Sequence, residues 1–417
     1  MNWQYEKLGQ LCEIQIGKTP ARKEAKYWGE GYPWLSISDM KQGRFLTTTK
    51  ESITDTAVKE CRCKLVPKDT LLLSFKLSIG KLGFTRVPLY TNEAIAALYI
   101  KSEKLVFKPY LYWALQFVDL LQYVDSAVMG NTLNKKKLHQ VEIPLPPLAE
   151  QKRIAAILDK ADALRAKRRQ AIAKLDSLLQ ATFLDMFGDP VTNPKNISKL
   201  TLNEITLNIT DGKHGDCKPS ENSGYYFVSV KDIKSGQIDY SNARQIDYDD
   251  FLEVHRRTRL EEGDVLITNS GTIGRTAVIM QSPLVERTTF QKSVAIVKPD
   301  KKKISSLYLR AALNMCVVNL TRVSSGSSQK NLLLRQLRNF EVCVPPFDQQ
   351  HEFALRVQEI GRLETVHKQA FNKLDTLFHA LQQQAFRGEL SGAEASSVPV
   401  GSSEESARSS SEQYRLW

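Results

Sequence analysis

Apolar or nearly apolar side chains recur at alternating three- and four-residue intervals in two long stretches of the chain. In the first stretch these positions are Ile154, Leu158, Ala161, Ile172, Leu175, Leu179, Thr182 and Met186. In the second they are Phe353, Val357, Ile360, Phe371, Leu374, Phe378, Leu381 and Ala385. This is the spacing of a coiled-coil seam. We therefore predict two long helices that pack on one another, at residues 148–187 and 347–390.

The middle of each predicted seam is polar. Arg165 and Arg168 interrupt the first stripe, and Glu364 and His367 interrupt the second. A polar layer of this kind lowers the stability of a coiled coil but can fix its register and orientation. Each stretch has about 40 residues, or about 60 Å of helix at 1.5 Å per residue, which is longer than the usual core helix.

Both predicted helices follow a di-proline segment, and the two segments are similar. "IPLPPLAEQKRIAAILDKADAL" occupies Ile143–Leu164, and "VCVPPFDQQHEFALRVQEIGRL" occupies Val342–Leu363. Earlier segments also form pairs: "WLSISDMKQG" with "FVSVKDIKSG", and "PKDTLLLSFKLSIGK" with "EEGDVLITNSGTIGR". A period of nearly 200 residues excludes a solenoid, whose repeats have about 20–50 residues. The chain is therefore a duplicated unit of one globular domain followed by one long helix.

Both globular parts have short runs of Val, Ile, Leu and Tyr between Gly, Pro, Asp and Lys turn signals, which predicts β-strands. We predict an α+β protein with globular domains at 1–147 and 200–346, a linker at 188–199 and a disordered Ser-rich tail at 391–417. Because the second domain begins where the first helix ends, the second helix must run back to bury its stripe. The expected architecture is two β-rich domains held apart by two long antiparallel helices, with approximate two-fold symmetry.

The chain has a formal net charge of +12 at pH 7, which favours a polyanionic partner such as nucleic acid, or an anionic membrane surface. No apolar run approaches the roughly 18 residues of a membrane span, and the first residues lack a secretory signal pattern, so we expect a cytoplasmic protein. The cysteines have no zinc-ligand spacing and the histidines are scattered, so no metal site is expected.

Three motifs resemble catalytic or cofactor-binding loops but fail in detail. "IGKTP" (Ile16–Pro20) follows Cys12, where a phosphate-binding loop needs glycine. "SGTIGR" (Ser270–Arg275) is better explained as a turn between strands. "VPPF" (Val344–Phe347) lacks the polar first residue with which amino-group methyltransferases bind the target amine. We therefore expect no catalytic residue and no cofactor in this chain.

The remaining polar residues are suited to nucleic-acid recognition. Lys and Arg neutralise phosphates, and Asn, Gln, Arg and Lys can hydrogen-bond to base edges. Residues of these types concentrate in equivalent loops of the two domains, with different identities. The candidate DNA-binding residues are Lys18, Arg22, Lys23, Lys76, Lys81, Asn131, Asn134, Lys135, Lys136, Lys137, Lys213, His214, Asn269, Arg275, Gln329 and Lys330.

The long helices also carry apolar residues outside the predicted seam. These are Ile157, Leu164 and Leu178 on the first helix, and Leu355, Leu363 and Leu377 on the second. Contiguous exposed apolar surface usually marks a protein interface. Because the duplication presents two similar faces, we expect two copies of one partner to bind there.

The di-proline segments, "TDGKHGDCKPS", "FVSVKDIKSG" and the ending "LFHALQQQAFRGEL" resemble the specificity (S) subunit of type I restriction-modification systems, up to about Leu390. The second copy departs from the family pattern, with Gln349–Gln350 for Glu-Gln and Phe347–Asp348 for Leu-Ala. The resemblance implies that each globular domain is a target recognition domain, which reads one half of a bipartite double-stranded DNA site. It also implies that the helices set the unread spacer and dock two methyltransferase (M) subunits.

The resemblance further implies that S-adenosylmethionine, ATP and magnesium act in the M subunits and in restriction (R) subunits. Two other interpretations stay open: a coiled-coil scaffold that binds other proteins, and a fused DNA methyltransferase. Binding of S-adenosylmethionine to the isolated chain would favour the methyltransferase. DNA binding that weakens steeply with salt would exclude the pure scaffold.

Overall fold

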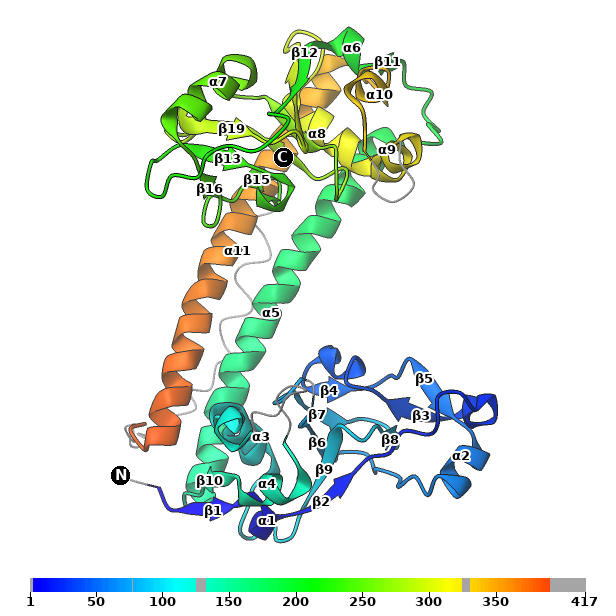
Figure 1. Cartoon of the computed structure of the whole chain (residues 1–417), viewed down its shortest axis with the longest axis vertical. Coiled ribbons are helices and arrows are strands. Elements are labelled where there is room, and N and C mark those ends of the chain that lie inside the picture. Colours follow the sequence, from blue (N-terminus) through cyan, green and yellow to red (C-terminus); the bar gives the residue numbers. More distant parts are fainter. Residues whose placement is uncertain (1–2, 77, 125–132, 325–330, 391–417) are drawn as a thin grey trace, which may run out of the picture. The chain divides into compact units, whose positions relative to one another are not determined.

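The computed structural model describes residues 3–76, 78–124, 133–324 and 331–390 (Figure 1). Two helices are long: α5 spans Leu148–Phe187 and α11 spans Phe347–Arg387. The chain divides into two compact units, one made of Met1–Ala166 with Asn372–Trp417 and the other of Lys167–Phe371. Each unit contains one globular domain and parts of both long helices. The tail at 391–417 and the candidates Asn131, Gln329 and Lys330 lie outside the described residues.

The first domain contains a five-stranded sheet in the order β2-β9-β6-β7-β4, a three-stranded sheet in the order β5-β3-β8, and the pair β1-β10. Its strands are β1 (Tyr5–Lys7), β2 (Cys12–Ile16), β3 (Trp28–Leu35), β4 (Phe45–Leu46), β5 (Glu51–Ile53), β6 (Leu71–Ser74), β7 (Leu82–Thr85), β8 (Tyr90–Thr91), β9 (Ile95–Ile100) and β10 (Glu142–Pro144). Its helices are α1 (Leu8–Leu11), α2 (Asp55–Glu60), α3 (Lys108–Phe117) and α4 (Lys135–Gln140), with 3-10 turns η1 (Ala25–Tyr27), η2 (Asp39–Gln42) and η3 (Leu120–Tyr123).

The larger sheet of the first domain is buried on both faces. In β6, Leu71 and Leu73 belong to the hydrophobic cluster that includes α3 and the long helices, whereas Leu72 belongs to a second cluster with Leu46 and Val66. This alternation follows from the two-residue period of a β-strand. Burial on both sides explains why this strand is a continuous apolar run in the sequence.

The second domain contains a four-stranded sheet in the order β12-β20-β17-β18, a three-stranded sheet in the order β16-β13-β19, and the pairs β14-β15 and β11-β21. Its strands are β11 (Lys199–Thr201), β12 (Thr206–Asp211), β13 (Tyr226–Val228), β14 (Ile233–Lys234), β15 (Gln237–Ile238), β16 (Arg244–Gln245), β17 (Val265–Thr268), β18 (Thr276–Val278), β19 (Thr288–Phe290), β20 (Val294–Pro299) and β21 (Glu341–Cys343). Its helices are α6 (Leu202–Ile205), α7 (Tyr248–Thr258), α8 (Ser306–Met315), α9 (Val317–Val323) and α10 (Leu334–Arg338), with 3-10 turns η4 (Val230–Asp232) and η5 (Val285–Arg287).

The two domains repeat one strand order. The series β2-β9-β6-β7 corresponds to β12-β20-β17-β18, and β5-β3-β8 corresponds to β16-β13-β19. In each three-stranded sheet the central strand pairs in parallel with one neighbour, β3 with β8 and β13 with β19. The internal duplication expected from the sequence is therefore confirmed in the fold.

A buried glutamine explains the first copy of the di-proline motif. Gln151 Nε2 donates hydrogen bonds to the carbonyls of Pro146 and Leu105, both at 2.9 Å, and Gln151 Oε1 accepts from the amide of Phe107 at 2.9 Å. The side chain thus connects the start of α5 to the proline segment and to the loop before α3.

Gln350 makes the equivalent bonds in the second copy. Its Nε2 donates to the carbonyls of Pro345 at 2.8 Å and Lys303 at 3.3 Å, and its Oε1 accepts from the amide of Ser305 at 2.8 Å. Buried backbone groups need hydrogen-bond partners, and the glutamine in the first turn of each long helix supplies them.

The long helices run antiparallel within each unit. In the first unit, Ile154 near the start of α5 shares a hydrophobic core with Phe378 near the end of α11. In the second unit, Phe183 near the end of α5 packs edge-on against Phe353 near the start of α11, with ring centroids 5.6 Å apart. Each domain therefore shares its core with the helix ends next to it.

The middle of the seam is polar, as the sequence suggests. Glu364 does not pair with either of the two arginines across the seam. Arg165 forms an ion pair with Asp375, and its guanidinium lies 4.2 Å from the ring centroid of Phe378. Arg168 Nη1 lies 2.8 Å from His367 Nδ1. Glu364 pairs with a lysine on its own helix.

Candidate nucleic-acid interface

A glycine followed by a lysine comes directly after the first strand of the larger sheet in each domain. A Cβ added to Gly17 or Gly212 would lie only 2.2 Å or 2.0 Å from a backbone carbonyl of the neighbouring segment, so a larger residue does not fit without a shift. The amide of Lys18 donates to a backbone carbonyl of β8 at 2.7 Å, and the amide of Lys213 donates to a carbonyl of the equivalent strand, β19, at 2.8 Å. The backbone therefore places the two lysines at equivalent points.

The surroundings of these two lysines differ. Lys18 is exposed, whereas Lys213 Nζ lies 2.8 Å from Glu253 Oε2 and 3.0 Å from Asp250 Oδ1 on α7. Two hydrogen bonds, the larger effect coming from Glu253 and the smaller from Asp250, raise the pKa of Lys213 well above its ordinary value. The amide of Lys218 and the Lys213 ammonium lower the pKa of Asp250. Lys213 is thus neutralised within the protein, which makes Lys18 the better candidate for a phosphate contact.

Arg22 is held over aromatic rings in the first domain. Its guanidinium carbon lies 4.1 Å from the ring centroid of Trp28 and 4.9 Å from that of Trp34, and its two terminal nitrogens pair with Glu51. Trp34 Nε1 donates to the carbonyl of Lys18 at 3.0 Å. The fold therefore brings Lys18 and Arg22 together around one buried tryptophan.

The second domain has a similar ion pair with the charges exchanged. Strand register places Trp34 opposite Glu51 in the first domain, and Phe227 opposite Arg244 in the second. Arg244 lies 5.1 Å from the ring centroid of Phe227 and pairs with Asp216. The loop contributes the cation in one domain and the anion in the other, so one backbone arrangement presents opposite charges.

The turns after β6 and β17 carry four further candidates. Ser74 Oγ accepts from the amide of Lys81, and Thr268 Oγ1 accepts from the amide of Arg275, both at 2.9 Å, which closes each turn in the same way. Lys81 is half-buried and Arg275 is exposed. Lys76 is half-buried, with its Nζ 5.5 Å from the ring of the preceding phenylalanine.

Asn269, the fourth of these candidates, is buried. It is 6% exposed, and its Oδ1 has no hydrogen-bond partner among the described residues. Asn269 and His214 line one cavity of about 140 Å³, so the fold brings these two candidates together. The other lining residues are Asp211, Ser270, Lys292, Asn331, Leu332, Leu333 and Leu334.

The candidates near α4 divide into a structural residue and surface lysines. Asn134 Oδ1 accepts from the amide of Lys137 at 3.0 Å and so caps the helix. Lys135 and Lys136 are exposed, and Lys137 is half-buried. Lys23 is also exposed, in the loop before β3.

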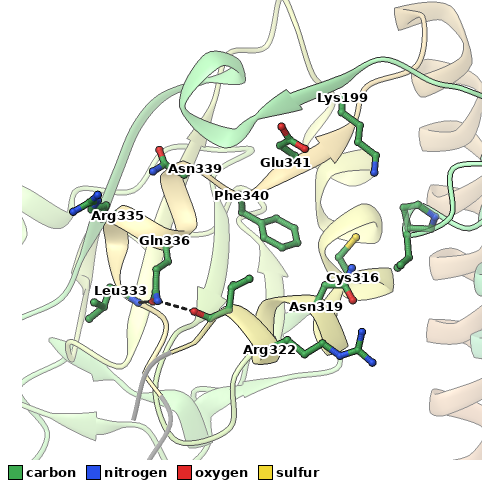
Figure 2. Close-up of a pocket in the computed structure, with 13 residues that line it drawn as sticks. Lys199, Cys316, Asn319, Arg322, Leu333, Arg335, Gln336, Asn339, Phe340 and Glu341 are labelled. Atoms are coloured by element: carbon green, nitrogen blue, oxygen red, sulfur yellow. Dashed lines mark hydrogen bonds between the residues drawn. The ribbon is translucent and has the colours of Figure 1, made fainter.

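Sequence reasoning missed a basic cavity in the second unit. Lys199, Arg322 and Arg335 line a cavity of about 840 Å³ together with Glu341. Figure 2 shows these side chains. Gln336 also lines it and donates through Nε2 to a backbone carbonyl of α9 at 2.6 Å. Because these residues come from β11, α9, α10 and β21, no local motif could indicate the cavity.

The residues predicted to bind a partner protein are partly exposed. Leu164, Leu178, Leu355 and Leu377 are each about half exposed, between 46% and 53%. Ile157 and Leu363 are half-buried. These four leucines are large apolar side chains with much of their surface exposed.

Within the described ranges, no group of three or more His, Cys, Asp or Glu residues is arranged to hold a metal ion. No helix in those ranges is long and apolar enough to cross a membrane. The cysteines are free, and burial raises the pKa of the Cys316 thiol to about 11, so this thiol is protonated at neutral pH.

Comparison with known proteins identifies relatives along most of the chain. A family model described as the type I restriction modification DNA specificity domain matches residues 1–175 and 211–384. The type I restriction enzyme MjaIX specificity subunit of Methanocaldococcus jannaschii is 24% identical over 416 residues, which covers 93% of this chain and 94% of that protein.

Two solved structures share the fold. One is the S subunit of a type I restriction-modification system from M. genitalium, with a TM-score of 0.53 and 16% identity, covering 93% of this chain and 96% of that one. The other comes from work on complex assembly and conformational transition of the type I R-M system, with a TM-score of 0.53 and 16% identity, covering 93% and 98%.

Proposed function

This chain belongs to the type I restriction-modification DNA specificity family, and we propose that each of its two domains binds one half of a bipartite double-stranded DNA site. The observation that carries the proposal is the duplication. The domains share a strand order, a buried glutamine at the helix start and a glycine-lysine segment. They differ in the side chains at equivalent loops, as two readers of different sequences must.

The exchanged ion pairs support separate readout by the two domains. The first domain has the ion pair Arg22–Glu51, and the second domain has the ion pair Asp216–Arg244 at the equivalent place. Each pair lies beside an equivalent aromatic position. An ion pair is compatible with either polarity, so the fold itself does not dictate the choice. The polarity instead changes which bases or phosphates each domain can contact.

The long helices have two roles in this proposal. They set the length of the unread DNA between the half-sites, and they dock two methyltransferase (M) subunits. The docking residues are Ile157, Leu164 and Leu377 in one unit and Leu178, Leu355 and Leu363 in the other. The exposed apolar surface of the four half-exposed leucines among them supports docking. The duplication supports two equivalent partners.

In the same proposal the chain has no catalytic role. The M subunits bind S-adenosylmethionine and methylate DNA, and restriction (R) subunits use ATP and magnesium to cleave it. The family's designation as a specificity domain and the net charge of +12 support a DNA-binding role for this chain. Isothermal titration of the isolated chain with S-adenosylmethionine should show no binding, and clear binding would favour a fused methyltransferase instead.

A domain exchange tests the central claim. The chain is expressed with its methyltransferase, and methylated sites are mapped by sequencing. Replacing residues 1–147 with the same region of a relative should change one half of the methylated motif and leave the other half intact. Replacing 200–346 should give the reciprocal result. A change in both halves from either exchange would contradict separate readout.

Direct binding provides a second test. Affinity for a duplex should fall steeply as salt increases, because each neutralised phosphate releases counterions. Affinity that is independent of salt would contradict a DNA-binding role and favour a protein scaffold.

A further inference from the structure

We propose that the cavity containing Asn269 is a base-reading site of the second domain, in which Asn269 Oδ1 accepts a hydrogen bond from the exocyclic amino group of a base. The inference rests on the proposed function and adds to it a residue and a chemistry. It starts from Oδ1 itself, a buried acceptor that has no partner among the described residues.

The internal repeat shows what the fold requires at this position. Asn269 in the second domain corresponds to Phe75 in the first, because each follows the hydroxyl residue that closes the turn. The carbonyl of Phe75 accepts from the amide of Leu133 at 3.2 Å, and that of Asn269 accepts from Leu332 at 2.7 Å. Phe75 is 2% exposed and belongs to the hydrophobic core. The fold therefore accepts an apolar side chain here and does not require asparagine.

A buried acceptor without a partner destabilises a protein. The first domain fills this position with the apolar Phe75, whereas the second domain has Asn269, whose buried oxygen is unsatisfied within the described part of the chain. The asparagine is therefore unfavourable at a position where the fold accepts an apolar residue. Such departures concentrate at functional sites. Asn269 is therefore best explained by a ligand that supplies the missing donor.

A second residue that lines the cavity is also polar where its equivalent in the first domain is apolar. Asp211 lines it in the second domain, directly before Gly212. The residue directly before Gly17 in the first domain is Ile16, which packs against the hydrophobic core. Two positions, the last residue of β12 and the residue directly after β17, are thus polar in the second domain, and their equivalents in the first domain are apolar.

The rim of the cavity differs in charge. In the first domain Thr19 is hydrogen-bonded to Glu93. In the second domain His214 occupies the position equivalent to Thr19, and Lys292 occupies the position equivalent to Glu93. Both side chains line the cavity and both are exposed. An acidic rim position in one copy is therefore basic in the other, as expected beside a DNA phosphate.

The unsatisfied atom distinguishes a base from the DNA backbone. Phosphate oxygens only accept hydrogen bonds, so they cannot satisfy Asn269 Oδ1. The donors on the major-groove edges of DNA are the amino groups of adenine N6 and cytosine N4. The volume of about 140 Å³ suits the edge of one base or a bridging water, whereas Lys292 and His214 at the rim suit the neighbouring phosphates.

The test is Asn269→Leu in the chain expressed with its methyltransferase, with methylated sites mapped by sequencing. Leucine has a similar volume and no acceptor. Discrimination should fall about 5- to 150-fold at one position of the second domain's half-site, the range for loss of one good base contact. The other half-site should not change. The melting temperature should stay equal or rise, because an unsatisfied acceptor is removed.

Asn203→Ala is the matched control, since Asn203 is exposed on α6 and does not line the cavity. It should leave the motif unchanged. If Asn269→Leu does not fold, Asn269→Ala removes the same acceptor without crowding the site, and the same relaxed position is expected.

An unchanged motif would overturn the inference at any melting temperature. With a lower melting temperature it would also assign Asn269 a structural role, for instance through a buried water. Relaxation in the half-site of the first domain would also overturn it. A wild-type chain that directs no bipartite methylation would instead refute the proposed function, so the two failures are distinguishable.

Discussion

Arg44 Nη1 lies 2.6 Å from Asp159 Oδ1, and this pair joins the first domain to the side of α5. Trp113 Nε1 donates to the same oxygen at 2.7 Å, and the Arg44 guanidinium lies 4.8 Å from the ring centroid of Tyr112. Arg44 Nε is buried without a partner among the described residues, so the guanidinium depends on Asp159 for its neutralisation. The pair therefore orients the domain on its helix.

We predict that Asp159→Ala lowers the free energy of unfolding by about 1–3 kcal/mol, because the buried Trp113 and the half-buried Arg44 lose their shared acceptor. Urea denaturation followed by tryptophan fluorescence measures the change. Gln358→Ala is the control, because Gln358 occupies the equivalent position on α11 and is exposed. Equal midpoints for both variants would show that the Arg44–Asp159 pair contributes nothing.

The Lys213 cluster predicts a pH-dependent contribution to stability. The folded-state pKa of Lys213 is raised above its ordinary value of 10.5, so its contribution is complete below that pH and is lost as pH rises through the raised value. The pKa of Asp250 is lowered below 3.8, so its contribution is complete above that pH and is lost as pH falls through the lowered value. The interaction is therefore present between about pH 4 and pH 10.

Lys213→Met should lower the free energy of unfolding by about 1 kcal/mol at pH 7, and the deficit should shrink as the pH falls below about 4, where Asp250 begins to lose its charge. Thermal melts across this pH range measure it. Lys18→Met is the matched control at the equivalent, exposed position, and should leave stability unchanged while reducing the salt dependence of DNA binding. A deficit that is constant with pH would contradict the electrostatic explanation.

The spacer role predicts the result of lengthening both helices. Inserting one heptad after Lys167 and one after His367 keeps the seam in phase and adds about 10 Å at 1.5 Å per residue. That length corresponds to about three base pairs. Mapping of methylated sites should show the same half-sites with a longer spacer. An active variant with an unchanged spacer would refute the role of the helices as a ruler.

The exposed leucines predict where the methyltransferase docks. Leu164→Glu with Leu355→Glu should reduce co-purification of the methyltransferase at least about tenfold, because burial of a carboxylate opposes docking. Leu252→Glu, which changes an exposed leucine on α7, is the control. Full co-purification with the double variant, or equal loss with the control, would place the docking surface elsewhere.

Sequence reasoning succeeded where short-range pattern decides structure. The three- and four-residue spacing of Ile154 to Met186 and of Phe353 to Ala385 indicated the long helices, because burial of one helix face imposes that period. The duplicated di-proline segments indicated the repeat, and the structure supplies the reason in Gln151 and Gln350, whose buried amides satisfy the backbone at each helix start.

Which side chains are available to DNA was decided only by the tertiary structure. Lys18 and Lys213 look alike in the sequence, yet carboxylates on α7, more than 35 residues away along the chain, neutralise Lys213 alone. Asn134 caps a helix, whereas Asn269 has a buried oxygen without a partner among the described residues and lines a cavity formed by segments distant in the sequence. The sequence by itself thus determined the duplicated architecture, because periodic burial is a local property. The fold decided the site, because charge neutralisation and hydrogen bonding depend on residues that only folding brings together.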